Sequence, residues 1–218
     1  MAIYLVRHGA DDESYRGGWS QRGLNTEGYR QSEKLGKYLE ARNSSTFRIG
    51  RIISSDLQRA LDTANELAAC LDIPVERDAQ WREMNNGIIA GMPNEIVDER
   101  FPGLYFSSLA MDERYPGGAS PAEFYSRIEI AFNRLCEHHL AQNSDSNILL
   151  VTHGGVINII YSILKGIAWT NRSKSFPSEH TSMHRIEHMD GKWTITLENA
   201  VGHFDGTKQA GKIPNADS

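Results

Sequence analysis

The chain has 218 residues, of which 39% are hydrophobic and 23% are charged, and its formal net charge is −5 at pH 7. This composition is typical of a soluble globular domain, and the acidic balance argues against a nucleic-acid-binding surface, which needs a basic face. No apolar run approaches the ~18 residues of a membrane span, and the start MAIYLVRHG does not resemble a secretory signal. We therefore expect a cytoplasmic protein whose partners include neither nucleic acid nor membrane.

Short apolar runs alternate with segments of helical periodicity through most of the chain. In 56–71, DLQRALDTANELAACL, apolar residues recur every three or four positions. Another helix starts at SPAE, which places a serine cap, a proline at the first helical position and a glutamate three residues after the cap. In chain order we predict a strand over 3–6, a loop over 7–24 and a helix over 25–41 capped by Asn25 or Thr26, then a strand over 50–55, the helix over 56–71 and an edge strand over 73–78. An irregular segment follows over 81–119, with a short helix at 93–101. The rest of the chain is predicted to form a helix over 120–140, a strand over 147–152, a helix over 154–164, and a hairpin of strands 181–188 and 192–199 around Asp190-Gly191.

This order of elements predicts an α/β fold, a three-layer α/β/α sandwich whose mostly parallel sheet has helices on both faces. We assign residues 1–204 to one catalytic domain and 205–218 to a loose tail without periodicity. Residues 84–118 are the predicted substrate lid, because long irregular stretches in compact domains are often functional. Cys70 and Cys136 lie beside apolar residues in predicted helices, which favours two free, mostly buried thiols.

Two predicted strands each deliver a histidine at their carboxyl end. IYLVRHG ends in His8, and ILLVTHGG ends in His153. Ligands of an open parallel sheet bind beyond the carboxyl ends of its strands, so both histidines should face one pocket. Arg7, Arg59 near the start of the second helix, and Glu83 after the third strand should face the same pocket. Arginines and a helix N-terminus bind phosphate oxygens well, and they supply the charge that a metal would otherwise provide.

The predicted pocket also suits covalent catalysis. A neutral imidazole nitrogen can attack phosphorus and form a phosphohistidine, which divides one difficult displacement into two easier ones. A nearby carboxylic acid can protonate the leaving oxygen and then, as carboxylate, deprotonate the attacking water. Glu83 is the best-placed candidate for that role.

Five segments in the same order resemble successive motifs of the histidine phosphatase superfamily, also called phosphoglycerate-mutase-like. They are LVRHGADD, SSDLQRALDTA, WREMNNGIIAGM, RYPGGAS and LLVTHGGVI, and the resemblance spans residues 2 to 200. It implies that His8 is the phosphorylated nucleophile, that Arg7, Arg59 and His153 form the phosphate pocket, and that Glu83 is the proton donor. It also implies that neither a metal nor an organic cofactor is needed.

The loop after the first histidine departs from the family pattern. The family often continues with Glu-Thr or Glu-Ser, followed by an asparagine that contacts phosphate, whereas here Ala10 and Asp11 follow and no asparagine occurs before Asn25. The acidic run Asp11-Asp12-Glu13 beside the pocket either discourages a heavily charged substrate or points into solvent. Further candidate substrate-binding residues are Gly154 and, in place of the missing asparagine, Ser14, Arg16 and Ser20.

Two other departures bear on the reaction. RYPGGAS carries Ala119 where a glutamate is expected, and the chain lacks the long insert, rich in Lys and Arg, of the cofactor-dependent mutases. The sequence therefore resembles the phosphatase branches, including the fructose-2,6-bisphosphatase type, and predicts a metal-independent phosphomonoesterase that acts on a small phosphorylated metabolite. The alternatives are a mutase of the same fold and a non-catalytic module that binds a phosphorylated ligand.

A metal site is the remaining alternative, because His180, His184 and His188 are spaced by four residues. This spacing would bring their side chains together on a helix. Since TSMHRIEH reads as a strand, we expect that they do not converge on a metal.

Overall fold

The computed structural model describes residues 1–44, 47–142 and 146–204, so the predicted tail at 205–218 lies outside the described residues. The strands are β1 (Ala2–Arg7), β2 (Ile49–Ser54), β3 (Val75–Arg77), β4 (Asn147–Thr152), β5 (Met183–Met189) and β6 (Lys192–Ala200). The α-helices are α1 (Thr26–Glu40), α2 (Gln58–Leu71), α3 (Asn94–Arg100), α4 (Pro121–Ala141) and α5 (Gly154–Lys165), and short 3-10 helices lie at η1 (Ala79–Trp81), η2 (Gly87–Ile89) and η3 (Phe106–Ser108).

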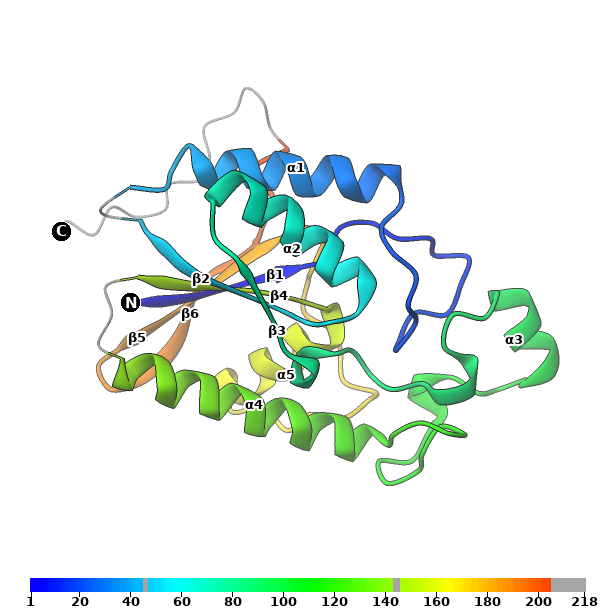
Figure 1. Ribbon diagram of the computed structural model, residues 1–218. Helices are drawn as coiled ribbons and strands as arrows, with labels where there is room; N and C mark the ends of the chain where they lie inside the picture. Colours follow the sequence, from blue (N-terminus) through cyan, green and yellow to red (C-terminus); the bar gives the residue numbers. More distant parts are fainter. Residues whose placement is uncertain (45–46, 143–145, 205–218) are drawn as a thin grey trace.

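These described residues form a six-stranded sheet in the order β3-β2-β4-β1-β5-β6. Strands β3, β2, β4 and β1 run parallel, whereas β5 pairs antiparallel with β1, and β6 antiparallel with β5. Helices α1 and α2 cover one face, and α4 and α5 cover the other (Figure 1). The predicted three-layer sandwich with a mostly parallel sheet and an edge strand β3 is confirmed.

Strand β1 shows why both faces of the sheet are covered. Ala2, Tyr4 and Val6 belong to the apolar cluster under α1 and α2, while Ile3 and Leu5 belong to the cluster under α4 and α5. Successive side chains of a strand point to opposite faces, so a strand that is covered twice is apolar throughout. The same argument explains the apolar run ILLV in β4, which is buried along its whole length.

The helix ends follow the local sequence signals, with one correction. Asn25 caps α1 by accepting a hydrogen bond from Gly28 N at 2.9 Å, and Ser120 forms the predicted capping box at the start of α4. Helix α2 starts at Gln58 and not at residue 56, which was predicted wrongly. The Asp56 carboxylate instead forms two 2.6 Å hydrogen bonds with the Arg82 guanidinium, so it does not cap the helix.

The C-terminal hairpin forms where it was predicted. Asp190 and Gly191, with φ of 49° and 77°, form the tight turn, and such left-handed pairs suit the twist of a two-residue hairpin loop. Strand β5 starts at Met183 and not at Thr181, because Thr181 has a φ of 55° and cannot be part of a strand.

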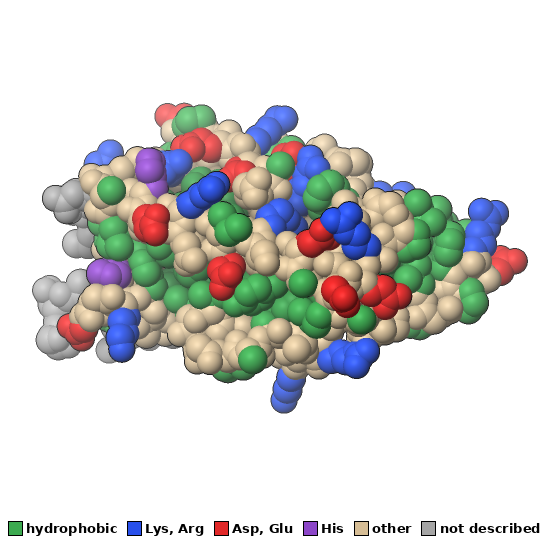
Figure 2. All heavy atoms as spheres, turned by 90° about the horizontal axis from the view of Figure 1, so that it is seen from below, with side chains coloured by type: hydrophobic (Ala, Val, Ile, Leu, Met, Phe, Trp, Pro, Cys, Tyr) green, Lys and Arg blue, Asp and Glu red, His purple; other side chains and the backbone are tan. Residues whose placement is uncertain are grey.

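Cys136 is buried and Cys70 partly buried, and both are free thiols, as expected. Within the described ranges, no helix has the length and apolar character that crossing a membrane requires. The face that carries α4 presents apolar side chains with charged side chains of both signs scattered among them (Figure 2).

Candidate active site

A cavity of about 660 Å³ lies at the carboxyl ends of the parallel strands. Its lining includes six of the predicted site residues, namely Arg7, His8, Arg16, Arg59, Glu83 and Gly154. They come from four separate stretches of chain, which the parallel strands bring to one edge of the sheet.

The His8 ring has a defined orientation and tautomer. Its Nδ1 lies 2.8 Å from Gly9 O, and because a carbonyl oxygen can only accept, Nδ1 carries the proton. Nε2 therefore holds a lone pair, and it accepts a hydrogen bond from Arg59 Nε at 3.2 Å. Gly9 allows the close approach of this turn to α1, since a Cβ there would lie only 2.6 Å from Gly28 O.

His8 is uncharged in this environment. Its side chain is 5% exposed, and burial is the largest cause that holds its pKa well below the ordinary value, followed by the positive charges of Arg59 and Arg7. A neutral imidazole with its lone pair on Nε2 is the form that can act as a nucleophile.

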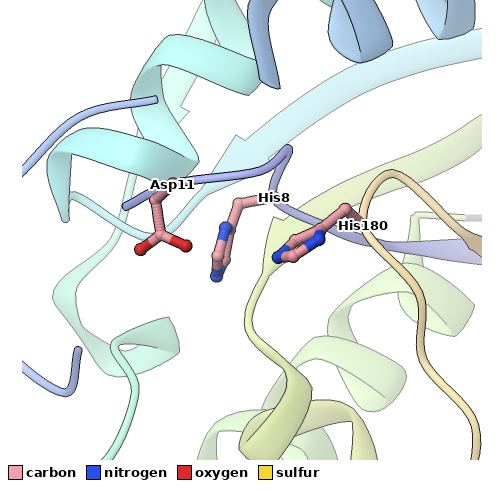
Figure 3. A group of neighbouring side chains, drawn as sticks. All are labelled: His8, Asp11 and His180. Carbon is pink, nitrogen blue, oxygen red and sulfur yellow. The ribbon is translucent and has the colours of Figure 1, made fainter. Parts of the chain in front are cut away.

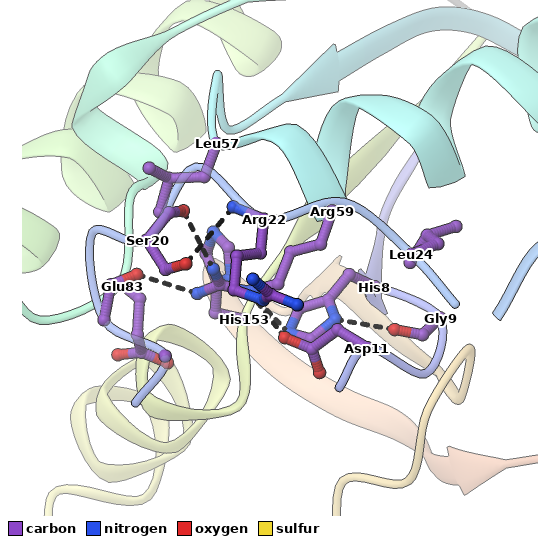
Figure 4. Close-up of polar contacts among 12 residues, drawn as sticks. His8, Gly9, Asp11, Ser20, Arg22, Leu24, Leu57, Arg59, Glu83 and His153 are labelled. Carbon is purple, nitrogen blue, oxygen red and sulfur yellow. Dashed lines mark hydrogen bonds and ion pairs between the residues drawn. The ribbon is translucent and has the colours of Figure 1, made fainter. Parts of the chain in front are cut away.

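Arg59 connects helix α2 to the loop after β1. Its guanidinium is buried, with Nη1 donating to Ser20 O at 3.3 Å and Nη2 to Gly18 O at 2.8 Å. Asp11 Oδ2 lies 3.7 Å from Arg59 Nε. These contacts fix the guanidinium beside the His8 ring (Figure 4).

Arg7 is held from the other side by the segment before β5. Its Nη1 donates to Ser178 O at 2.6 Å, and its Nη2 donates to His180 Nε2 at 3.0 Å. The buried Arg7 Nε has no hydrogen-bond partner within the described part of the chain, and a Cβ on Gly154 would lie 3.8 Å from it. The Nε–H of Arg7 is thus a donor that the described protein residues leave unused, beside the cavity residue Gly154.

His153 lies next to His8 but does not line the cavity. The two ring centroids are 5.1 Å apart, and His153 is fully buried. Its Nε2 lies 2.8 Å from Ser55 Oγ, and its Nδ1 has no partner among the described residues. Burial, and then the positive charge of Arg59, hold the pKa of His153 well below its ordinary value, so this histidine is also neutral.

Glu83 is anchored by the backbone at the start of α5. Its Oε1 accepts from Met84 N at 2.8 Å, and its Oε2 accepts from Gly155 N at 2.9 Å. A Cβ on Gly155 would lie 2.2 Å from Glu83 Oε1, so only glycine permits this contact. The carboxylate is therefore held against the N-terminus of a helix, a favourable position for negative charge.

The three candidates for the missing asparagine lie in different places. Arg16 lines the cavity, and its Nη2 donates to Asp98 Oδ1 at 2.6 Å. Ser14 is exposed and donates to Asp12 Oδ1, and the buried Ser20 hydroxyl accepts from Arg22 N. Neither serine lines the cavity, so of the three only Arg16 is positioned to meet a ligand there.

Two walls of the cavity differ in origin. The strand-end wall consists of Arg7, His8, Arg59 and Gly154, and follows the parallel strands. The irregular wall comes from 84–118 and from the segment after α5, and carries amide and aromatic side chains: Asn86, Phe106, Tyr115, Trp169, Asn171 and Phe176. Trp169 stacks on Tyr125 with ring centroids 5.7 Å apart, which gives this wall a packed aromatic core.

Sequence reasoning missed His180 as a site residue. His8, Asp11 and His180 each offer a ligand atom, and all three atoms lie within 4.8 Å of one another, so among the described residues this group could hold a metal ion (Figure 3). Arg59 donates to Nε2 of His8, and Arg7 donates to Nε2 of His180. The positive charge of the two guanidiniums opposes binding of a cation and favours an anion.

The sequence predicts that the side chains of His180, His184 and His188 do not converge on a metal, and the structure places them in different surroundings. His184 is buried and its Nδ1 lies 2.6 Å from Tyr161 Oη, whereas the His188 ring packs against Trp193. In the described ranges, no group of potential metal ligands includes His184 or His188.

Comparisons with known proteins identify the family of this chain. The profile of the histidine phosphatase superfamily, branch 1, matches residues 3–201. Phosphoglycerate mutase-like protein 4 of Arabidopsis thaliana is 32% identical over 213 residues, covering 94% of this chain and 87% of the plant protein. Probable phosphoglycerate mutase GpmB of Salmonella choleraesuis (strain SC-B67) is 30% identical, covering 94% of this chain and 95% of its own.

Solved structures show the same fold. A mycobacterial glucosyl-3-phosphoglycerate phosphatase in complex with VO3 superposes with a TM-score of 0.72 at 23% identity, covering 91% of this chain and 98% of its own. The alpha-ribazole phosphatase from Shigella flexneri gives a TM-score of 0.75 at 22% identity, with coverage of 92% and 97%. With the site geometry and the profile that matches nearly its whole length, the chain belongs to branch 1 of the histidine phosphatase superfamily.

Proposed function

We propose that this protein is a phosphomonoesterase that hydrolyses a small phosphorylated metabolite through phospho-His8, without a metal. The observation that carries the proposal is the Nδ1–H hydrogen bond from His8 to Gly9 O, which leaves the Nε2 lone pair in the cavity beside Arg59. Arg7 and Arg59 provide the positive charge that stabilises the phosphoryl group during transfer.

The proposed reaction has two displacements. In the first, His8 Nε2 bonds to phosphorus, the bond from phosphorus to the ester oxygen breaks, and Glu83 as a carboxylic acid gives its proton to that oxygen. In the second, water attacks phosphorus, the carboxylate takes a proton from the water, and the N–P bond breaks. Phosphate leaves, and His8 and the carboxyl group return to their starting states.

The irregular wall supports a substrate of modest charge. Its cavity-lining side chains are mainly amides, aromatic rings and hydroxyls together with Lys174, and Asp11, Asp12 and Glu13 add negative charge at the cavity. A substrate with several phosphates would meet this negative charge, whereas an alcohol with ring or hydroxyl groups would pack against the aromatic side chains. We propose residues 84–118 as the segment that selects the alcohol, and the cytoplasm remains the predicted location.

A mutase is the second candidate, because both curated relatives described above carry mutase names. A mutase must keep the phosphoryl group on His8 until an acceptor hydroxyl of the sugar acid replaces water. The acidic residues at the cavity disfavour the carboxylate of such a sugar acid, which favours the phosphatase.

One experiment tests the proposal. The purified protein is incubated with 4-nitrophenyl phosphate in excess chelator, and the release of phosphate is followed. We expect hydrolysis that added Mg²⁺ or Zn²⁺ does not increase. Loss of activity in chelator that is restored by metal would contradict the mechanism, and phosphate that stays on the protein until a sugar acid is added would favour the mutase.

A further inference from the structure

The cavity contains a second carboxylate that the proposed reaction does not use. Asp11 lines the cavity, and its side chain is 19% exposed. Its close polar partner is Arg59, and no hydrogen bond to the Asp11 carboxylate is formed within 1–44, 47–142 and 146–204. A carboxylate that faces the ligand space with free lone pairs can accept a proton there, and the resulting carboxylic acid can donate it.

Asp11 lies on the reactive side of the His8 ring. Arg59 Nε contacts both His8 Nε2, at 3.2 Å, and Asp11 Oδ2, at 3.7 Å. A ring nitrogen of His8 and a carboxylate oxygen of Asp11 lie within 4.8 Å of each other (Figure 3). In an in-line displacement at phosphorus the ester oxygen lies beyond phosphorus from Nε2, on the side of the cavity, and a carboxylate that lines the cavity within 4.8 Å of the His8 ring has the reach to meet it there.

The environment of Glu83 is different. Both Glu83 oxygens already accept backbone hydrogen bonds, from Met84 N at 2.8 Å and from Gly155 N at 2.9 Å. These donors hold the side chain in place and compete with a proton for its lone pairs. Asp11 has no such donors, so proton transfer at its oxygens displaces no protein hydrogen bond.

We propose that Asp11 is a second acid–base residue of this pocket. As a carboxylic acid it gives its proton to the ester oxygen while the P–O bond breaks and the N–P bond to His8 forms. As a carboxylate it takes a proton from the water that attacks phospho-His8, which restores the acid. Asp11 and Glu83 therefore share the proton transfer, so that either one alone supports part of the rate. This inference rests on the proposed function.

The test compares Asp11→Asn, Glu83→Gln and the double variant on methyl phosphate and 4-nitrophenyl phosphate. General acid catalysis helps a basic leaving group most and is typically worth about 10²–10⁴-fold. We expect each single variant to lose more kcat/KM on methyl phosphate than on the nitrophenyl ester, and the double variant to lose more than either. Because a negative charge has been removed, inorganic phosphate should inhibit Asp11→Asn at least as strongly as the wild type.

Asp72→Asn is the matched control. Asp72 is exposed at the C-terminal end of α2 with a φ of 55°, a conformation that asparagine tolerates, and the same charge is removed. We expect its rates on both esters to equal those of the wild type. Comparable thermal unfolding of all variants establishes that differences in rate do not come from misfolding.

The outcomes separate this inference from the proposed function. If the wild type hydrolyses both esters and Asp11→Asn does so at the same rates, Asp11 takes no part in the reaction. If Asp11→Asn loses the same factor on both esters and binds inorganic phosphate more weakly, Asp11 only positions Arg59, and the inference is also overturned. If the wild type itself hydrolyses neither ester and forms no phosphohistidine, the proposed function fails, and this inference fails with it.

Discussion

The strand-end wall and the irregular wall differ in how their side chains are held. On the strand-end wall, each charged or imidazole group is fixed by hydrogen bonds, such as His8 to Gly9 O and Arg59 to Gly18 O. On the irregular wall, Phe106 and Trp169 pack through their rings. Fixed charges suit the phosphoryl group, which all substrates of such an enzyme share. Aromatic rings instead provide an apolar surface against which the alcohol part of the substrate, which differs from one ester to another, can pack.

His8→Ala should remove turnover almost completely, by about 10⁴-fold or more, because covalent catalysis depends on one nitrogen. Binding of inorganic phosphate should largely persist, since Arg7, Arg59 and Gly154 remain in the wall. The phosphorylated peptide of the wild type, trapped under non-acidic conditions and mapped, should contain His8. Label on the peptide that contains His153 would reverse the assignment.

Arg59→Lys should lower kcat/KM by about 10²–10³-fold, the usual effect of removing one preorganised donor. Lysine keeps the charge but cannot form the planar fork that reaches Gly18 O, Ser20 O and His8 Nε2 together. Steady-state kinetics on 4-nitrophenyl phosphate measure the loss. A lysine variant with wild-type activity would show that charge alone is sufficient at this wall.

The side of the molecule with the strand ends should also be the part that is sensitive to acid. Burial lowers the pKa of His184 from 6.5 to about 4, while 84–118 and 167–178 contain no histidine. A histidine that is neutral when folded takes up its proton on unfolding, so its contribution is complete above pH 6.5 and is lost as the pH falls toward 4. Because of His184 alone, the free energy of unfolding should fall by about 2–3 kcal/mol as the pH is lowered from 7.5 to 4.5.

Urea unfolding of His184→Gln and of His138→Gln at both pH values measures this effect. His138 is exposed, so its variant should keep the acid sensitivity of the wild type. His184→Gln is expected to be less stable at neutral pH, because Tyr161 loses its partner, but its stability should depend less on pH. Equal pH dependence in both variants would contradict the assignment to His184.

Trp169→Ala should have the smallest effect and should affect only substrates with a ring. Loss of one aromatic contact raises KM by about 2- to 10-fold for phenyl phosphate. KM for methyl phosphate should stay unchanged, because the strand-end wall alone binds its phosphoryl group. A similar rise for both esters would show that the irregular wall also orders the phosphate end.

Several site residues could be identified from the sequence because local signals and simple topology agree. The apolar runs before His8 and His153 are strands that are covered on both faces, and parallel strands bring their carboxyl ends to one edge. Glycines at 9 and 155 mark the close approaches that the site requires. The order of layers and the caps at Asn25 and Ser120 follow from periodicity and capping chemistry in the same way.

Tertiary structure decided the remaining features. His180 joins the site because β5 pairs antiparallel with β1, which brings the residues before Met183 beside Arg7. The sequence predicts that hairpin but not the strand against which it packs. Asp11 lines the cavity and Ser14 does not, because hydrogen bonds of this loop to Arg59 of α2 and to Asn94 and Asp98 of α3 set its path. The amino-acid sequence by itself thus determined the strand ends and their charges, whose positions depend on local periodicity. The irregular wall and the second carboxylate depend on contacts between distant segments, and only the folded chain fixes them.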